Sequence, residues 1–173
     1  MTDSLVVGAG YRGTGRRVSV GFDRRARARA RARARDGVGP GGLRAVYTAI
    51  REGVREVLRV GGVDDADITV VLMDDEGMAA LNGRYLAHGE PTDVISFPMW
   101  SEGEVVTGDV CIGVEQALRQ ASALGVDGVE ELVRLAVHGT LHVLGWDHPE
   151  RGDREESAMW ALQEGIVAQV MSE

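Results

Sequence analysis

Three of the four histidines in this 173-residue chain lie within the eleven-residue segment HGTLHVLGWDH, residues 138–148. His138 and His142 are four residues apart, a spacing that places two side chains on one face of an α-helix. Two imidazoles arranged in this way can reach one metal ion at about 2.0–2.1 Å, the usual zinc–nitrogen distance. Gly145 stands where a helix end often needs a positive φ, so the chain can turn back and bring His148 to the same ion. We therefore predict a metal site with His138, His142 and His148 as its ligands.

Three imidazoles favour zinc, one ion per chain, although nickel, copper and iron are chemically compatible. A structural zinc site usually has four protein ligands, whereas a catalytic zinc with three keeps a position for water. The predicted site is therefore an open one, which implies hydrolysis by metal-activated water. Cys111 and His88, both distant in sequence, stay open as a fourth ligand. For Asp147, next to His148, we leave two alternatives: contact with a ligating histidine, or an ordinary surface carboxylate.

The spacing H-x3-H-x2-G-x2-H also occurs in zinc peptidases, where a glutamate directly follows the first histidine. In this chain the corresponding residue is Gly139. Because the peptidase mechanism requires that carboxylate, the glycine argues against a peptidase. A base from elsewhere in the fold keeps a zinc metallopeptidase-like hydrolase as an alternative.

The elements that must position these residues follow from hydrophobic periodicity and from turn residues. Helices are expected at residues 43–58, in a short segment capped by Asp74 or Asp75, at 115–124, at about 128–144, and after the capping pair Asp153 and Glu156. Strands are expected at residues 18–22, 67–73, 93–98 and 108–114, with the last two paired. We predict an α+β fold in which a small mixed sheet of about four strands packs with about five helices. The metal site would lie on the helix at 128–144 and on the turn that follows it.

The charge distribution divides the chain into a basic N-terminal segment, residues 1–40, and a single metal-dependent hydrolase domain, residues 41–173. Residues 1–36 hold 10 arginines against 3 acidic residues, whereas residues 37–173 hold 9 against 24. The N-terminal segment contains one short strand and the Arg-Ala run at 24–35, which has no apolar stripe to bury and is expected to be disordered. Whether this run is a cationic arm for RNA phosphates or a solvated linker stays open.

Composition excludes several classes of protein. Hydrophobic residues make up 44% of the chain and charged residues 27%, which is typical of a globular domain. No apolar run approaches the roughly 18 residues of a membrane span, so no membrane partner is expected. The single cysteine, Cys111, forms no internal disulfide, fits a cytoplasmic location, and is expected to be a buried, inert thiol.

Four segments of the chain resemble the YbeY family, bacterial single-strand-specific endoribonucleases of rRNA maturation and ribosome quality control. The segment HGTLHVLGWDH resembles the family signature. The other three are LNGRYLAHGEPTDVISFP (81–98), GDVCIG (108–113) and EESAMWALQEGIV (155–167). They occur in the family's order and together span about residues 67–170.

The resemblance implies that His138, His142 and His148 bind the catalytic metal, generally zinc, and that the protein processes the 3′ end of 16S rRNA in the cytoplasm. The implied partners are rRNA and the ribosome or its small subunit, with a ribosomal protein or a GTPase as compatible further partners. One departure concerns the residue after the tyrosine of L-N-x-x-Y, where family members commonly have an arginine and this chain has Leu86. His88 takes the place of the next basic residue. Arg84 is either a substitute RNA contact or an ordinary surface arginine.

The sequence thus supports a metal-dependent endoribonuclease but does not identify its general base. Water, the substrate and Asp93 are the candidates. Thr92, Asp93 and Ser96 would line the site, although a capped turn entering a strand explains the same residues. A non-catalytic ribosome assembly factor, whose metal only braces the fold, is a further alternative, because the acidic domain is an awkward surface for RNA.

Overall fold

The computed structural model describes residues 15–23, 42–85, 91–147 and 157–172, and within these ranges the chain forms four strands and five helices. The strands are β1 (Arg16–Phe22), β2 (Ala66–Met73), β3 (Val94–Pro98) and β4 (Val106–Gly113). The helices are α2 (Gly42–Val60), α3 (Asp75–Tyr85), α4 (Val114–Leu124), α5 (Gly128–Val143) and α6 (Ala158–Met171). The predicted α+β fold is confirmed, and each of these elements overlaps an expected one.

All four strands form one mixed sheet in the order β1-β2-β4-β3. β1, β2 and β4 run parallel, and β3 runs antiparallel to β4 with Ile95 opposite Cys111. The predicted pairing of the last two strands is therefore confirmed. The short strand of the N-terminal segment is the edge strand β1, so it belongs to the same sheet as the strands of the domain. The Arg-Ala run lies outside the described residues, and both alternatives for it stay predictions.

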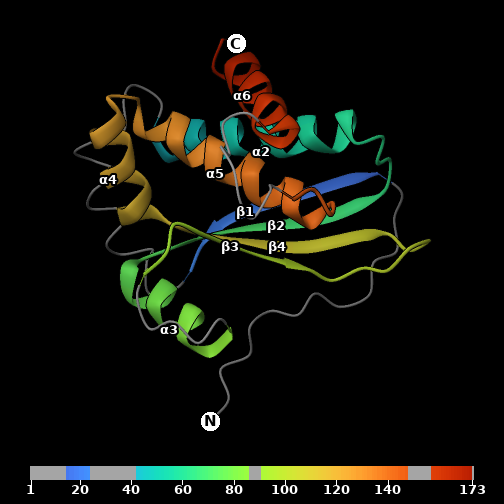
Figure 1. Ribbon diagram of the computed structural model, residues 1–173, viewed down its shortest axis with the longest axis horizontal. Coiled ribbons are helices and arrows are strands. Elements are labelled where there is room, and N and C mark those ends of the chain that lie inside the picture. Colours follow the sequence, from blue (N-terminus) through green and yellow to red (C-terminus); the bar gives the residue numbers. More distant parts are fainter. Residues whose placement is uncertain (1–14, 24–41, 86–90, 148–156, 173) are drawn as a thin grey trace.

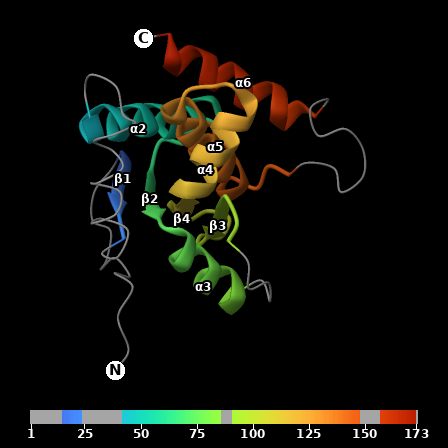
Figure 2. The ribbon, with the colours of Figure 1, turned by 90° about the vertical axis from the view of Figure 1, so that its left-hand side faces the viewer.

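The sheet lies between two unequal layers of helices (Figure 1). Helices α2 and α5 cover one face and α6 lies outside them, while α3 lies against the opposite face. Figure 2 shows the same arrangement from the side. Alternate residues of β2 are fully buried because one side of the strand faces the core under α2 and α5. Those residues are Ala66, Ile68, Val70 and Leu72.

A smaller cluster fills the space beneath α3, where Met78 packs with Ile95 and Cys111. Burial, together with the nearby Asp109 and Asp23, raises the pKa of the Cys111 thiol to about 12, so the thiol stays protonated at neutral pH. The expected buried and inert cysteine is confirmed. Cys111 lies on the sheet face away from α5, and therefore it is not a fourth ligand to the predicted metal.

Polar caps begin the helices on both sides of the sheet. Asp74 accepts a hydrogen bond from the Gly77 amide at 2.9 Å and caps α3, as the sequence predicted. The N-cap of α6 is Ser157, whose hydroxyl accepts from the Trp160 amide at 3.1 Å. The capping pair expected for this helix, Asp153 and Glu156, lies outside the described residues. Among the helices that the structure describes, none is long and apolar enough to cross a membrane.

Candidate metal centre

Helix α5 brings the first two predicted ligands together, as the four-residue spacing requires. Asp127 caps the helix by accepting from the Val129 amide at 2.8 Å, and the helix runs without interruption through His138 and His142. The Nε2 atoms of the two histidines lie 3.1 Å apart, with the ring planes at 80°. Two nitrogens of one tetrahedral zinc site are separated by about 3.3 Å at the usual bond length. The pair thus has the separation that a shared ion needs.

The other nitrogen of each ring faces an acceptor. His138 Nδ1 is 2.8 Å from Oε1 of Gln163, and His142 Nδ1 is 2.9 Å from the backbone oxygen of Trp146. A carbonyl oxygen only accepts, so each Nδ1 carries a proton, and in the neutral ring each Nε2 then presents a lone pair. Two lone pairs that face each other across 3.1 Å repel unless a cation lies between them. The donor set of the described residues therefore fits a metal ion bound by both imidazoles.

The end of α5 positions the Trp146 carbonyl. Gly145 has a φ of +83°, the left-handed conformation predicted from sequence. The Trp146 amide donates to Leu141 O at 3.0 Å, and the Gly145 amide donates to His142 O at 3.0 Å. These two bonds form a Schellman motif, which turns the chain back over the last turn of the helix. Gly145 therefore also orients the second predicted ligand, His142, through the Trp146 carbonyl.

The third predicted ligand, His148, and the alternative ligand His88 both lie outside the described residues. Within the ranges that the structure describes, no group of three or more His, Cys, Asp or Glu side chains could hold a metal. The structure thus brings together two of the three predicted ligands, and the role of His148 stays a prediction. Asp147 is exposed at the end of the described segment, and its predicted contact also stays a prediction.

Gly139 packs directly against the sheet. A Cβ at this position would lie 2.5 Å from Val110 Cγ1 and 2.9 Å from Ser96 Oγ. A side chain at position 139 would point toward β3 and β4, and contacts this short require Val110 or Ser96 to move. Close packing therefore favours glycine at the position that the peptidases give to glutamate, and a buried carboxylate there would meet the sheet instead of the metal site.

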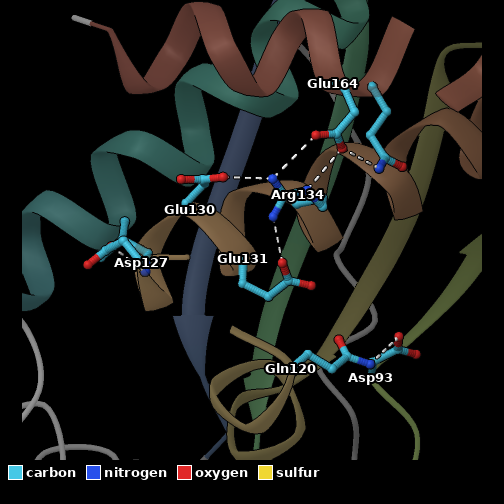
Figure 3. Close-up of polar contacts among 9 residues, drawn as sticks. Asp93, Gln120, Asp127, Glu130, Glu131, Arg134 and Glu164 are labelled. Atoms are coloured by element: carbon cyan, nitrogen blue, oxygen red, sulfur yellow. Dashed lines mark hydrogen bonds and ion pairs between the residues drawn. The ribbon is translucent and has the colours of Figure 1, made fainter. Parts of the chain in front are cut away.

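A cavity of about 220 Å³ opens beside His138, between α4, α5, α6 and the start of β3. Asp93, Gln120 and Trp160 contribute to its wall. Asp93 Oδ1 accepts from the Val94 amide at 2.8 Å, and Oδ2 accepts from the Gln120 side chain at 3.1 Å (Figure 3). Asp93 therefore caps the turn into β3 and ties it to α4, while lining the same cavity as a predicted metal ligand. Its role as a general base stays a prediction.

A cluster that sequence analysis missed joins α5 to α6 next to the histidines. Arg134, with a side chain only 14% exposed, contacts Glu130 at 2.7 Å, Glu131 at 2.6 Å and Glu164 at 2.9 Å (Figure 3). Burial alone would lower the pKa of Arg134, but the hydrogen bonds that it donates to Glu164, Glu130 and Glu131 together raise this pKa. The guanidinium is therefore a permanent cation at the helix interface. The sequence held one hint of a polar contact at this interface: Gln163, next to Glu164, is a polar residue within the apolar stripe of the last helix.

Arg84, the candidate substitute for the family's arginine, lies exposed in the last turn of α3. Its guanidinium carbon lies 5.5 Å from the ring centroid of Tyr85, and that ring packs edge-on against Phe97 at 5.2 Å. This cation–π contact keeps the charge at the surface beside an exposed aromatic ring. Leu86 lies outside the described residues. Contact between Arg84 and RNA stays a prediction.

This chain is similar in sequence to proteins of a known family. The family model "Endoribonuclease YbeY" matches residues 43–171 of this chain. The chain belongs to the YbeY family. A YbeY endoribonuclease of Persephonella marina is 35% identical over 127 residues, which are 71% of this chain and 82% of the relative. A second, from Aquifex aeolicus, is 40% identical over 111 residues, which are 63% of this chain and 73% of the relative.

A solved structure supports the fold of this YbeY chain. The solution structure of TM1509 from Thermotoga maritima matches with a TM-score of 0.58, covering 90% of this chain and 89% of that one. The sequence identity is 21%, so the likeness concerns the fold alone. The resemblance noted in four segments of the sequence is therefore confirmed at the level of family and fold.

Proposed function

We propose that this protein is an endoribonuclease that uses one zinc ion to cut single-stranded RNA. We further propose that it matures the 3′ end of 16S rRNA and acts in ribosome quality control in the cytoplasm. The observation that carries the metal-dependent part is the pair of Nε2 atoms of His138 and His142, which lie 3.1 Å apart on one face of α5. Membership of the YbeY family supports RNA as the substrate.

In this proposal His138, His142 and His148 hold the metal. When bound, the ion would polarise a scissile phosphate and lower the pKa of water or of the RNA 2′-hydroxyl. The hydrogen bonds at each Nδ1 keep the Nε2 lone pairs directed toward the ion. Asp93 is the candidate for proton transfer because its carboxylate lines the cavity beside His138.

Arg84 is the described arginine that we assign to phosphate contact outside the metal site. Its exposed guanidinium lies beside an exposed tyrosine ring, a combination suited to a phosphate and its neighbouring base. Replacing Arg84 with alanine should weaken RNA binding evenly across sequences and lower the salt dependence of binding. Arg55→Ala, on α2, is the matched control, because Arg55 is also exposed and pairs with Glu52 one turn earlier in the same helix. Unchanged RNA binding in Arg84→Ala would contradict the assignment.

The test of the proposed function compares the purified protein with its His142→Ala variant. Each is incubated with single-stranded rRNA fragments and, separately, with an unstructured peptide, with and without a metal chelator. We expect RNA cuts that disappear with chelator, return on adding zinc, and are absent in the variant. The variant is the essential control, since contaminating ribonuclease would survive the mutation.

The two alternatives give different outcomes in the same experiment. Peptide cleavage would support the metallopeptidase-like hydrolase, which the packing of Gly139 against the sheet disfavours. Tight binding to the small ribosomal subunit without any cleavage would support the non-catalytic assembly factor, with possible partners such as a ribosomal protein or GTPase then identified by pull-down. Either result would overturn the proposed endoribonuclease.

A further inference from the structure

We propose that Gln163 of α6 is a positioning residue for the metal site, because it selects the tautomer of His138 that can bind a metal. The inference rests on the proposed metal site but concerns a residue that lies 25 positions away in sequence from the ligand it contacts. The Gln163 side chain is almost fully buried, with 2% of the residue exposed. Its amide faces the histidine from the neighbouring helix.

The orientation of the Gln163 amide is set by the neighbouring Glu164 carboxylate and not by the histidine itself. Its Nε2 donates to Oε1 of Glu164 at 2.9 Å. The same Glu164 oxygen accepts from Arg134 Nε at 2.9 Å. Because a carboxylate oxygen accepts only, the NH₂ group of Gln163 must point toward Glu164, and Oε1 must point toward His138. The Arg134–Glu164 ion pair therefore fixes which end of the amide the imidazole meets.

This amide orientation favours one tautomer of the neutral His138 ring, with its proton on Nδ1. Oε1 of Gln163 accepts from Nδ1 at 2.8 Å, so the proton of the neutral ring stays on Nδ1 and the Nε2 lone pair faces His142. A flipped amide would present a donor to Nδ1, move the ring proton to Nε2, and block the nitrogen that must bind the metal. The chain of contacts from Arg134 through Glu164 and Gln163 thus favours the metal-binding tautomer before the metal arrives.

Zinc affinity, measured by competition with a chromogenic chelator, tests this role without requiring activity. Gln163→Leu keeps the volume of the side chain but removes the acceptor, and we expect the affinity for zinc to fall about 10- to 100-fold. Gln163→Glu restores an acceptor oxygen and should recover most of that loss. Gln169→Leu, at an exposed position on the same helix, is the matched control and should bind zinc like the wild type.

Nitrogen-15 NMR of the metal-free protein provides a second readout that a merely structural role would not change. The wild type should show His138 as the Nδ1–H tautomer, and Gln163→Leu should show a mixture of tautomers. Thermal unfolding of the metal-free variants identifies any that do not fold. If Gln163→Leu fails to fold, the comparison of Gln163→Glu with Arg134→Met decides, because the first should keep the tautomer and the second should lose it.

The outcomes separate this inference from the proposed function. If neither the wild type nor His142→Ala binds zinc, the proposed metal site is wrong and this inference falls with it. If the wild type binds zinc, His142→Ala does not, and Gln163→Leu binds as tightly as the wild type, only the role of Gln163 is overturned. An equal loss in Gln163→Glu and Gln163→Leu would also overturn it.

Discussion

Among single residues, the neighbouring positions His138 and Gly139 of α5 face in different directions. His138 turns toward α6 and His142, whereas Gly139 turns toward the sheet and leaves room for Val110 and Ser96. The absence of a glutamate after the first histidine is therefore explained by where the helix packs. Asp93, directly before β3, lines the same cavity as His138, as does Glu131, which is paired with Arg134. The role of Asp93 in proton transfer stays a prediction, as do the alternatives of water and the substrate.

Gly139→Ala tests this close packing. The added Cβ would meet Val110 Cγ1 at 2.5 Å, so the helix must move away from the sheet, and we expect a loss of about 1–3 kcal/mol in the free energy of unfolding. Gly165→Ala on α6 is the control: no atom lies within 4 Å of its added Cβ. That substitution should raise stability by up to about 1 kcal/mol, because alanine favours the helix. Urea unfolding measures both, and equal effects would contradict the packing argument.

At the scale of elements, the interface between α5 and α6 combines apolar packing with one buried cation. Met159, Ile166 and Val167 of α6 belong to the main core. Arg134 of α5 pairs with Glu164 across the interface and with Glu130 and Glu131 of its own helix. Since Glu131 is itself buried, the arginine is required to balance charge inside the interface. The same ion pairs orient Gln163, so the interface that holds α6 in place also orients the amide that contacts His138.

Arg134→Met should be strongly destabilising. Methionine fills a similar volume but leaves Glu131 and Glu164 without their cation, and we expect a loss of about 3 kcal/mol in the free energy of unfolding. Arg119→Met is the matched control, because Arg119 pairs with Asp75 at 2.9 Å on the surface, where solvent screens the interaction. Its urea midpoint should scarcely change. Similar midpoints for the two variants would show that burial of the Arg134 cluster does not matter.

At the scale of the whole molecule, the two faces of the sheet differ in how well they are covered. Helices α2 and α5 cover one face with α6 outside them, while α3 lies against the other face (Figures 1 and 2). Polar residues therefore occur on the α3 face, among them Asp109 of β4. Partial burial, together with the nearby Asp67, raises the pKa of the Asp109 carboxyl. A charge at this position opposes folding at neutral pH.

The expected effect of pH on Asp109 follows from the direction of this shift. In the unfolded chain the carboxyl ionises near its ordinary pKa of 3.8, whereas in the folded protein it ionises at a higher pH. Its ionisation thus costs no stability below pH 3.8, and the cost appears as the pH rises through the folded pKa. Asp109→Asn should therefore raise the urea midpoint slightly at pH 7 and leave it unchanged at pH 3. Asp64→Asn, at a side chain that is 94% exposed, is the control; an equal rise at both pH values in Asp109→Asn would indicate packing instead of charge.

The helices, the strands and the spacing of the histidines could be predicted from the sequence, because these features depend on residues close along the chain, and the four segments in the family's order were enough to indicate the family. Helical periodicity placed His138 and His142 on one face, and Gly145 predicted the turn after them. The packing of Gly139 against the sheet and the partners of the two Nδ1 atoms became known from the three-dimensional structure. Gln163 contacts His138, 25 positions away, and Arg134 contacts Glu164, 30 positions away, each on the other helix. No local pattern encodes such a contact, because it depends on how two helices pack over the same sheet.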